Sequence, residues 1–165
     1  MKFSVGVEYA IHCLLYMVKI DEGKTVKIKD LAEFQGVSES YLSKVYAKLS
    51  RAGIIKSISG VKGGYALSRS ADEITFLDIV EAVEGKEPFF QCVEIRQNNI
   101  LIDKNNLPRS YSKCPCLINV VMKEAENEMK KYLEKKTLGW LYDEVYNKKF
   151  PKEVEENTIK WFSER

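Results

Sequence analysis

The 165-residue sequence predicts a mainly α-helical fold with one small β-hairpin and a long helix in its second half. Apolar residues recur at helical spacing over most of the chain, and two short β-like runs lie close together at 54–59 and 65–70. The longest helical pattern begins at Leu117. A composition of 45% hydrophobic and 30% charged residues is typical of a soluble globular protein with a substantial core.

The first helix is expected at about 3–19, with an apolar stripe along one side. Glu8 and His12, the only histidine in the chain, lie one helical turn apart beside this stripe. Two interpretations remain open: a polar i,i+4 pair at the edge of a core helix, or a pair of ligands. Cys13, on the opposite side, is expected to be a small core residue.

Two further helices are expected in close succession, at 28–35 and 39–52. Gly36 separates them, Ser38 is suited to cap the second one at its N-terminus, and Gly53 is suited to end it. The outer face of the 39–52 helix is small, polar and basic. Two helices joined by a short turn, the second with such a face, indicate a helix-turn-helix.

The β-like runs that follow are joined by GVKGG at 60–64, whose glycines suit a hairpin loop with Lys62 at its tip. A hairpin directly after a helix-turn-helix is the wing of a winged helix. Residues 24–69 contain nine basic and three acidic residues, whereas the rest of the chain is net negative. This local excess of positive charge predicts an anionic partner, and the arrangement predicts double-stranded DNA.

The expected DNA contacts lie on the 39–52 helix, on the hairpin and just before each of them. Basic side chains would neutralise phosphates, and the start of the helix would approach base edges in the major groove. The residues expected at phosphates are Lys44, Lys48, Arg51 and Lys62, and those expected at base edges are Ser40, Tyr41 and Ser43. The complete set of expected contacts adds Lys27, Ser38, Ser59 and Gly63.

A fourth helix is expected after Thr75, with Asp78 able to complete a capping box and Gly85 at the end. The segment 86–116 has no clean period and holds three prolines and three of the four cysteines. We therefore expect a long loop there, and such loops in compact proteins are usually functional or disordered.

The long helical pattern runs to about Lys136 and is amphipathic, which in a protein of this kind favours a dimer seam. A short helix is expected at 137–146, and a last one is entered at Pro151 and anchored by Trp161 and Phe162. The predicted division is a DNA-binding domain (1–86), a cysteine-bearing sensor loop (87–116), a dimerisation helix with the following short helix (117–146) and a C-terminal extension (147–165).

The N-terminal apolar run superficially resembles a signal peptide, but Glu8 and His12 interrupt it and no small-residue cleavage site follows. It is also too short and too polar to span a bilayer. We expect a cytoplasmic protein with no membrane contact, in which cysteines favour metal or redox chemistry over structural disulfides. An enzyme is not expected, because the sequence has one histidine, no GxSxG motif and no phosphate-binding loop after a strand.

The segment VSESYLSKVYAKLSRAGIIKSISGVKGGYALSR at 37–69 resembles the recognition helix and wing of the IscR/NsrR/CymR-type winged-helix transcription regulators. EYAI at 8–11 and TLG at 137–139 match further segments, so the resemblance covers about 1–146. It implies a homodimer that binds a palindromic promoter site, and we expect a repressor. Members often carry an arginine in the wing where this chain has Ser59, so minor-groove reading by the wing does not carry over.

Some members of this family hold an iron–sulfur cluster in the loop before the dimer helix, where this chain has Cys92, Cys114 and Cys116. The usual set of three closely spaced cysteines is absent, because 21 residues separate Cys92 from Cys114. In one branch a 2Fe–2S cluster is held by a Glu and a His from helix 1 of one subunit and two cysteines of the other. Glu8 and His12 match that pair, so the resemblance implies 2Fe–2S rather than 4Fe–4S, with Cys92 and either Cys116 or Cys114.

Such a cluster would sense redox state, nitric oxide or iron–sulfur status. The chemistry of the residues also leaves other possibilities open. Cys114-Pro115-Cys116 precedes the long helix, whose N-terminus would stabilise thiolates, and Pro115 suits its first turn. Thiolates also bind zinc. The alternatives are a thiol switch without metal, a structural zinc site, or control by a protein partner.

Overall fold

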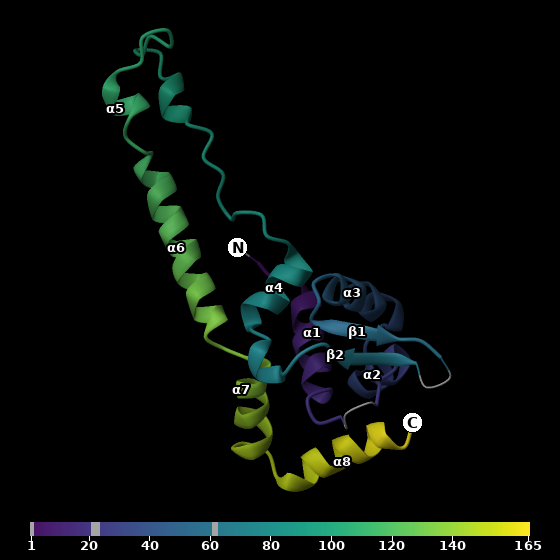
Figure 1. Cartoon of the computed structure of the whole chain (residues 1–165). Coiled ribbons are helices and arrows are strands. Elements are labelled where there is room, and N and C mark those ends of the chain that lie inside the picture. Colours follow the sequence, from purple (N-terminus) through teal and green to yellow (C-terminus); the bar gives the residue numbers. More distant parts are fainter. Residues whose placement is uncertain (1, 21–23, 61–62) are drawn as a thin grey trace. The chain divides into compact units, whose positions relative to one another are not determined.

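The computed structural model describes residues 2–20, 24–60 and 63–165 (Figure 1). Two compact units are present, residues 2–86 with 133–165, and residues 87–132. The larger unit contains α1 (Val5–Tyr16), α2 (Ile28–Gln35), α3 (Glu39–Arg51), β1 (Ile55–Ile58), β2 (Gly64–Leu67), the 3-10 turn η1 (Ala71–Glu73), α4 (Phe76–Glu84), α7 (Leu138–Tyr142), the π-helical turn η3 (Asp143–Asn147) and α8 (Lys152–Ser163). The smaller unit contains the 3-10 turn η2 (Ile95–Asn98), α5 (Arg109–Ser112) and most of α6 (Leu117–Glu134). The predicted fold class is confirmed.

The core of the larger unit lies between α1, α3 and α4, which pack against one another, while α2 packs against α3. Cys13 is completely buried there, and burial raises the pKa of its thiol to about 12. The prediction that Cys13 is a small core residue is confirmed. The core aliphatic side chains that are buried most completely are Leu14, Leu31, Leu42, Leu49, Ile54, Ile55, Ile74, Ile79 and Leu138.

The helix-turn-helix forms as the sequence predicts. α2 has the expected bounds, and α3 ends at Arg51, one residue earlier than expected. Gly36 and Gly53 follow the two helices, each with a φ of +70°. The side chain of Ser38 caps α3 by accepting the N–H of Tyr41 at 3.4 Å.

α1 is shorter than the predicted 3–19. Its C-terminal end tightens, because the N–H of Met17 bonds the carbonyl of Leu14, three residues back, at 3.0 Å. The chain then leaves the helix before the predicted end.

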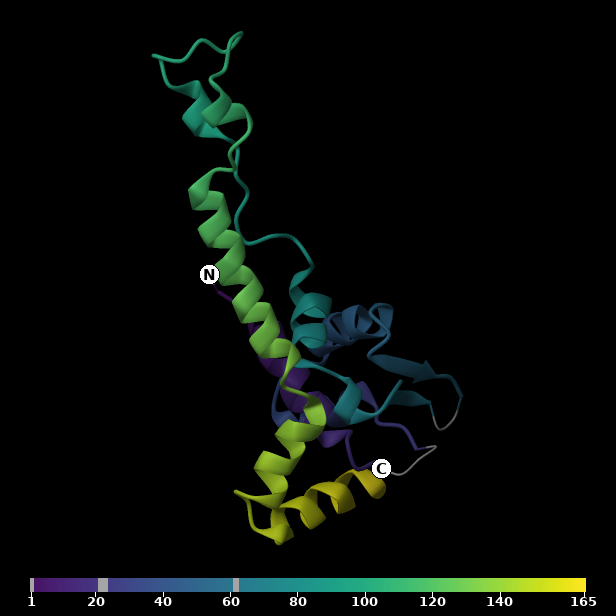
Figure 2. The same ribbon diagram turned by 60° about the vertical axis from the view of Figure 1, so that its left-hand side comes forward.

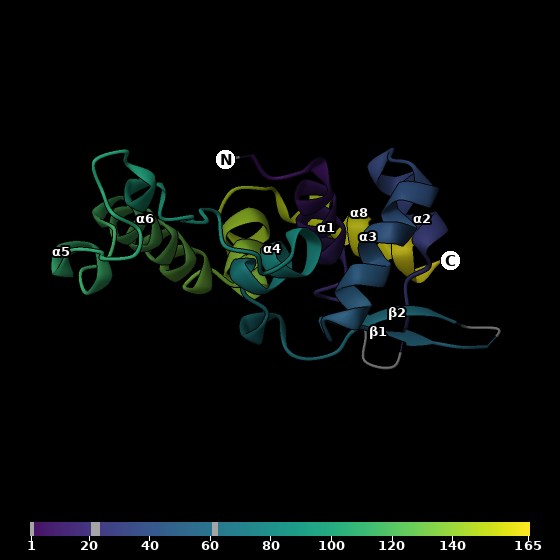
Figure 3. The ribbon, with the colours of Figure 1, turned by 90° about the horizontal axis from the view of Figure 1, so that it is seen from above.

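The wing is an antiparallel pair in which Ile55 faces Leu67 and Ile58 faces Gly64. The strands of the wing are shorter than the predicted runs 54–59 and 65–70. The N–H of Ile54 instead closes the end of α3 on the carbonyl of Leu49 at 3.0 Å. The hairpin extends away from the helices of its own unit (Figure 3).

The GGY sequence of the wing has a steric reason. A Cβ atom on Gly63 would lie 2.7 Å from the carbonyl oxygen of Ile58, closer than real Cβ atoms approach such an atom. The next residue but one, Tyr65, exchanges backbone hydrogen bonds of 2.8 and 2.9 Å with Val26, ahead of α2. The wing is therefore tied to the segment that leads into the helix-turn-helix.

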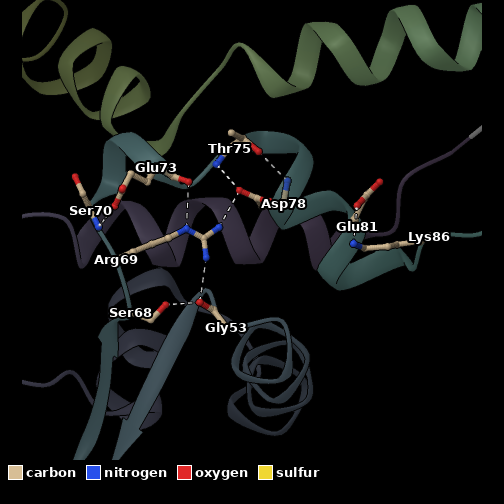
Figure 4. A network of polar contacts seen from close by, with 9 residues as sticks. All are labelled: Gly53, Ser68, Arg69, Ser70, Glu73, Thr75, Asp78, Glu81 and Lys86. Atoms are coloured by element: carbon tan, nitrogen blue, oxygen red, sulfur yellow. Dashed lines mark hydrogen bonds and ion pairs between the residues drawn. The ribbon is translucent and has the colours of Figure 1, made fainter.

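Arg69 connects the base of the wing to the helices (Figure 4). Its guanidinium donates to the carbonyl of Gly53 at 3.1 Å, to the carbonyl of Glu73 at 3.2 Å and to the carboxylate of Asp78 at 2.9 Å. Asp78 and Thr75 also form the predicted capping box, with bonds of 2.9 and 3.0 Å. One cation thus joins the end of α3, the end of β2 and the start of α4.

The TLG sequence at 137–139 starts α7. Thr137 caps the helix by accepting the N–H of Trp140 at 3.0 Å, and Leu138 is fully buried. A Cβ atom on Gly139 would overlap the carboxylate of Asp72 in η1. A larger residue here would therefore displace the exposed Asp72 side chain, because η1 and α7 pack closely together.

The C-terminal extension packs on the larger unit. α8 follows Pro151, as predicted, and the ring of Phe162 lies 4.9 Å from Phe34 and 5.9 Å from Tyr16 between ring centroids. Trp161 lies 4.9 Å from Phe34. The two predicted anchors thus join one aromatic cluster with residues of α1 and α2.

In the smaller unit, α6 is one unbroken helix, and the loop with η2 and α5 lies beyond its N-terminal end (Figure 2). The carbonyl of Cys116 accepts the first helical hydrogen bond, from the N–H of Val120 at 3.0 Å. Pro115 therefore precedes the helix cap, so its predicted place in the first turn is wrong. No helix in the described parts of the chain is long and apolar enough to cross a membrane.

Candidate DNA interface and cysteine pair

The exposed face of α3 carries the residues predicted to meet DNA. Ser40, Ser43 and Lys44 are exposed, whereas the opposite side of the helix is buried in the core. The hydroxyls of Ser40 and Ser38 lie 3.0 Å apart at the start of the helix. This face therefore presents hydroxyls at its N-terminal end and an ammonium group one turn later, a pattern suited to base edges and phosphates.

Tyr41, also predicted at base edges, is half-buried. Its ring packs edge-on against Tyr9 of α1, with ring centroids 5.4 Å apart. A Cβ atom on Gly6 would lie 3.2 Å from its hydroxyl oxygen, so the ring also reaches the start of α1. Tyr41 thus braces α3 against α1, and part of its ring surface is covered by this packing.

Two basic residues predicted at phosphates have contacts within the protein. The ammonium of Lys48 donates to the carbonyl of Val83, near the end of α4, at 2.6 Å. The guanidinium of Arg51 donates to the carbonyl of Ala47 at 3.3 Å. Lys48 therefore holds α3 against α4, a role that a sequence pattern of surface charge does not reveal.

The remaining predicted DNA residues flank α3. Lys27 is exposed at the N-cap of α2, and Ser59 is exposed directly after β1. Gly63 lies on the other side of the hairpin loop, directly before β2. Lys62 lies outside the described residues.

The cysteine loop brings two of its three thiols together. The thiol of Cys92 lies close enough to the sulfur of Cys116, directly before α6, to affect the pKa of Cys116. The pKa of Cys116 is lowered, chiefly by a hydrogen bond from the backbone N–H of Asn119. The N–H of Ile118 and the thiol of Cys92 add to this effect, while desolvation and Glu94 oppose it. Cys114 is exposed.

Glu94 and Arg96 lie beside this cysteine pair and form a polar network with it. Neither was among the predicted site residues. The thiol of Cys92 lies 3.8 Å from Oε1 of Glu94, and Nε of Arg96 lies 2.6 Å from Oε2 of Glu94. The alternation C-x-E-x-R at 92–96 was the available sequence signal.

Glu8 and His12 are exposed on α1, in the larger unit. Among the described residues, no three His, Cys, Asp or Glu side chains gather closely enough to hold one metal ion. One chain therefore supplies two adjacent thiols, which fit half of the ligand set of a four-ligand cluster. The described loop brings two of its three cysteines together and leaves Cys114 apart, so it does not form a set of three closely placed cysteines.

The family model for Rrf2, described as an iron-dependent transcriptional regulator, matches residues 3–144. The chain belongs to the Rrf2 family. Among its relatives is Protein rrf2 of Nitratidesulfovibrio vulgaris, 33% identical over 139 residues, which are 84% of this chain and 85% of the relative. YffB of Lactococcus lactis, provisionally named an HTH-type transcriptional regulator, is 32% identical over 148 residues, 89% of this chain and 91% of YffB.

Solved structures agree with the fold of this Rrf2 protein. T. potens IscR matches with a TM-score of 0.65 and 23% identity over 92% of this chain and 93% of that one. CymR (YrzC), the global cysteine regulator of B. subtilis, matches with a TM-score of 0.63 and 24% identity over 88% and 98%. The predicted resemblance is confirmed, and this member of the Rrf2 family is a DNA-binding transcriptional regulator rather than an enzyme. The family match ends before α8.

Proposed function

We propose that this Rrf2 protein is a homodimeric repressor that binds a palindromic promoter site and whose DNA affinity is controlled by a 2Fe–2S cluster. The observation that carries the cluster is the adjacent pair of thiols, Cys92 and Cys116, at the N-terminus of a helix. Two thiolates suit iron–sulfur chemistry, and the family description supports iron dependence.

The dimer is supported by the surface of α6. Leu117, Ile118, Val121 and Met122 lie at helical spacing and are 41–76% exposed, although they are large and apolar. Together they line a shallow hollow on the helix. Such a face on one side of an exposed helix favours pairing with a second copy.

Cys92 and Cys116 would supply two ligands, and Glu8 and His12 of the partner subunit would supply the other two. Both of these side chains are exposed on one side of α1, as a shared site requires. The exposure of Cys114, which lies outside the thiol contact, favours Cys116 as the second cysteine. When bound, the cluster would add a redox-active, nitric-oxide-reactive group to this site.

The chain's own residues would convert the state of the site into a change at DNA. Cys116 caps α6, so any change in the bonding of its sulfur acts on the first turn of the proposed dimer helix. A shift of that helix would change the spacing or angle of the two recognition helices. Base edges would be read by Ser40, Ser43 and Tyr41, and phosphates would be bound by Lys44, Lys48, Arg51 and Lys62.

A second candidate, a cluster-free thiol switch, is favoured by the same contact. Cys92 and Cys116 are adjacent, and the lowered pKa of Cys116 increases the share of its reactive thiolate. In this case the two thiols would respond to an oxidant directly, and Glu8 and His12 would have no role as ligands. A structural zinc site and a protein partner are further outcomes of the test below.

The test is the visible spectrum of anaerobically purified protein, with iron, sulfide and zinc analysis. The cluster predicts iron and sulfide in equal amounts, with two of each per cluster, and a spectrum altered by His12→Ala. Cys114→Ser is the matched control and should leave the spectrum unchanged. A colourless protein without iron would overturn the cluster, bound zinc would indicate a structural site, and a disulfide that forms on oxidation would support the thiol switch.

A further inference from the structure

The cysteine pair is surrounded by a polar network that the proposed ligands do not explain. Glu94 lies between Cys92 and Arg96, with Cys92 at 3.8 Å from one carboxylate oxygen and Arg96 Nε at 2.6 Å from the other. In the described parts of the chain, Glu94 is the only residue other than glycine with a positive φ, at 53°. A residue with a side chain rarely adopts this left-handed backbone conformation unless its surroundings stabilise it.

Arg96 also reaches the far side of the loop. Its Nη2 donates to the carbonyl of Cys114 at 2.6 Å and to that of Tyr111 at 3.4 Å. Its guanidinium lies over the ring of Tyr111, 5.6 Å from the ring centroid. One planar cation therefore joins the segment that carries Cys92 to the turn that carries Cys114 and Cys116.

We propose that Glu94 and Arg96 form a clamp that positions the thiols of Cys92 and Cys116 side by side before any group binds them. Glu94 orients the Cys92 side, and Arg96 fixes the main chain two residues before Cys116. The clamp deepens the proposed function, because it acts on the same pair, but it applies equally to a cluster and to a dithiol.

Arginine is suited to this role for a geometric reason. Its fork donates to a side chain through Nε and to backbone carbonyls through Nη2 at the same time, which a single ammonium group cannot reproduce in one plane. An isolated surface ion pair between Glu94 and Arg96 would contribute little. The additional bonds to Cys114 and Tyr111 distinguish the clamp from such a pair.

The test measures the equilibrium constant for forming the Cys92–Cys116 disulfide in the metal-free, full-length protein, with Cys114→Ser present in every variant. The protein is equilibrated at one pH in buffers of reduced glutathione and glutathione disulfide. Cys92 and Cys116 each lose a proton and together lose two electrons, which forms one S–S bond, while glutathione disulfide is reduced to two thiols. Maleimide labelling and mass spectrometry give the fraction of intramolecular disulfide.

We expect Arg96→Ala and Arg96→Lys each to lower the equilibrium constant for the disulfide at least about fivefold. Loss of the positive charge of Arg96 would by itself raise this equilibrium constant, because a nearby cation stabilises the thiolate of the reduced form. A decrease in both variants therefore reports lost positioning. Glu94→Gln should give a smaller decrease, and Arg109→Ala, an exposed arginine in the same loop, should give none.

An unchanged or increased constant in Arg96→Lys would overturn the clamp, as would an equal decrease in Arg109→Ala. Circular dichroism and the failure of buried Cys13 to react with maleimide verify that each variant is folded. If Arg96→Ala does not fold, Arg96→Lys and Glu94→Gln still decide. Absence of iron in the native protein would overturn the proposed cluster, but the disulfide equilibrium would still test the clamp, because it is measured without metal.

Discussion

Asp78 shows how one side chain fixes the junction between wing and helices. It forms the capping box of α4 with Thr75, and its carboxylate accepts a hydrogen bond from the guanidinium of Arg69 (Figure 4). The same guanidinium also bonds the carbonyl of Gly53 after α3. Desolvation raises its pKa, but the bonds from Thr75 and the charge of Arg69 have the larger combined effect, so the pKa of Asp78 is lowered. The ionised form is therefore the one that stabilises the fold.

This lowered pKa makes a prediction about acid stability. The contribution of Asp78 is complete above the unfolded-state pKa of about 3.9 and is lost as the pH falls through the lower folded-state pKa. Asp78→Asn should be less stable than the native protein at pH 7 and should approach it in acid. Urea unfolding midpoints between pH 7 and 2.5 check this. A constant difference between the two proteins over that range would contradict it.

At the scale of elements, α8 is the segment that lies beyond the family match. Phe162 is 8% exposed and packs on Phe34 and Tyr16, and Arg165 pairs with Glu33 of α2 at 2.8 Å. The helix-turn-helix therefore has its first helix supported from outside by the C-terminal extension.

Phe162→Ala should lower the free energy of unfolding by about 3 kcal/mol, because it removes a ring from a packed cluster. Denaturant unfolding of the whole chain measures the change. Val154→Ala, on the same helix but 40% exposed, is the control and should change stability by well under about 1 kcal/mol. Equal effects of the two substitutions would show that α8 is not packed as described.

The two lysines on α3 should separate DNA binding from stability. Lys44→Ala should lower DNA affinity and reduce the slope of log affinity against log salt by about 2 in a dimer, with unchanged stability. Lys48→Ala should in addition cost about 1 kcal/mol of stability, because its bond to Val83 is lost. Fluorescence anisotropy with a promoter fragment over a salt series, and urea unfolding, test both. Salt-independent binding would count against the interface.

For the whole molecule, the proposed dimer makes a prediction about the apolar face of α6. Val121 is 61% exposed, so a charge there would not disturb the core of one chain but would disrupt a paired helix face. Val121→Glu should give a monomer by analytical ultracentrifugation and should lose specific DNA binding. Asn127→Glu, at an exposed polar position of α6, should remain dimeric. A native protein that sediments as a monomer would overturn the proposed dimer.

Much of the fold followed from short-range chemistry. The Ser38 cap, the Thr75–Asp78 capping box and the breaks at Gly36 and Gly53 are local, so residue types and spacing were enough to place the helices. Predicted ends were less accurate at α1 and at the strands, where single backbone hydrogen bonds, such as that from Met17 to Leu14, set the end. Pro115 illustrates this, because the cap is set by the carbonyl of Cys116 and not by where proline is tolerated.

The sequence by itself determined the family, the helix-turn-helix with its wing, and the presence of a cysteine loop before a long helix. Only the tertiary structure decided which thiols meet, because the 23 residues between Cys92 and Cys116 allow many separations and the fold brings these two together. It also decided that Lys48 bonds Val83 and that Glu94 and Arg96 join the cysteine pair. Periodicity reports which side of a helix is apolar, whereas these contacts depend on where distant segments come to lie.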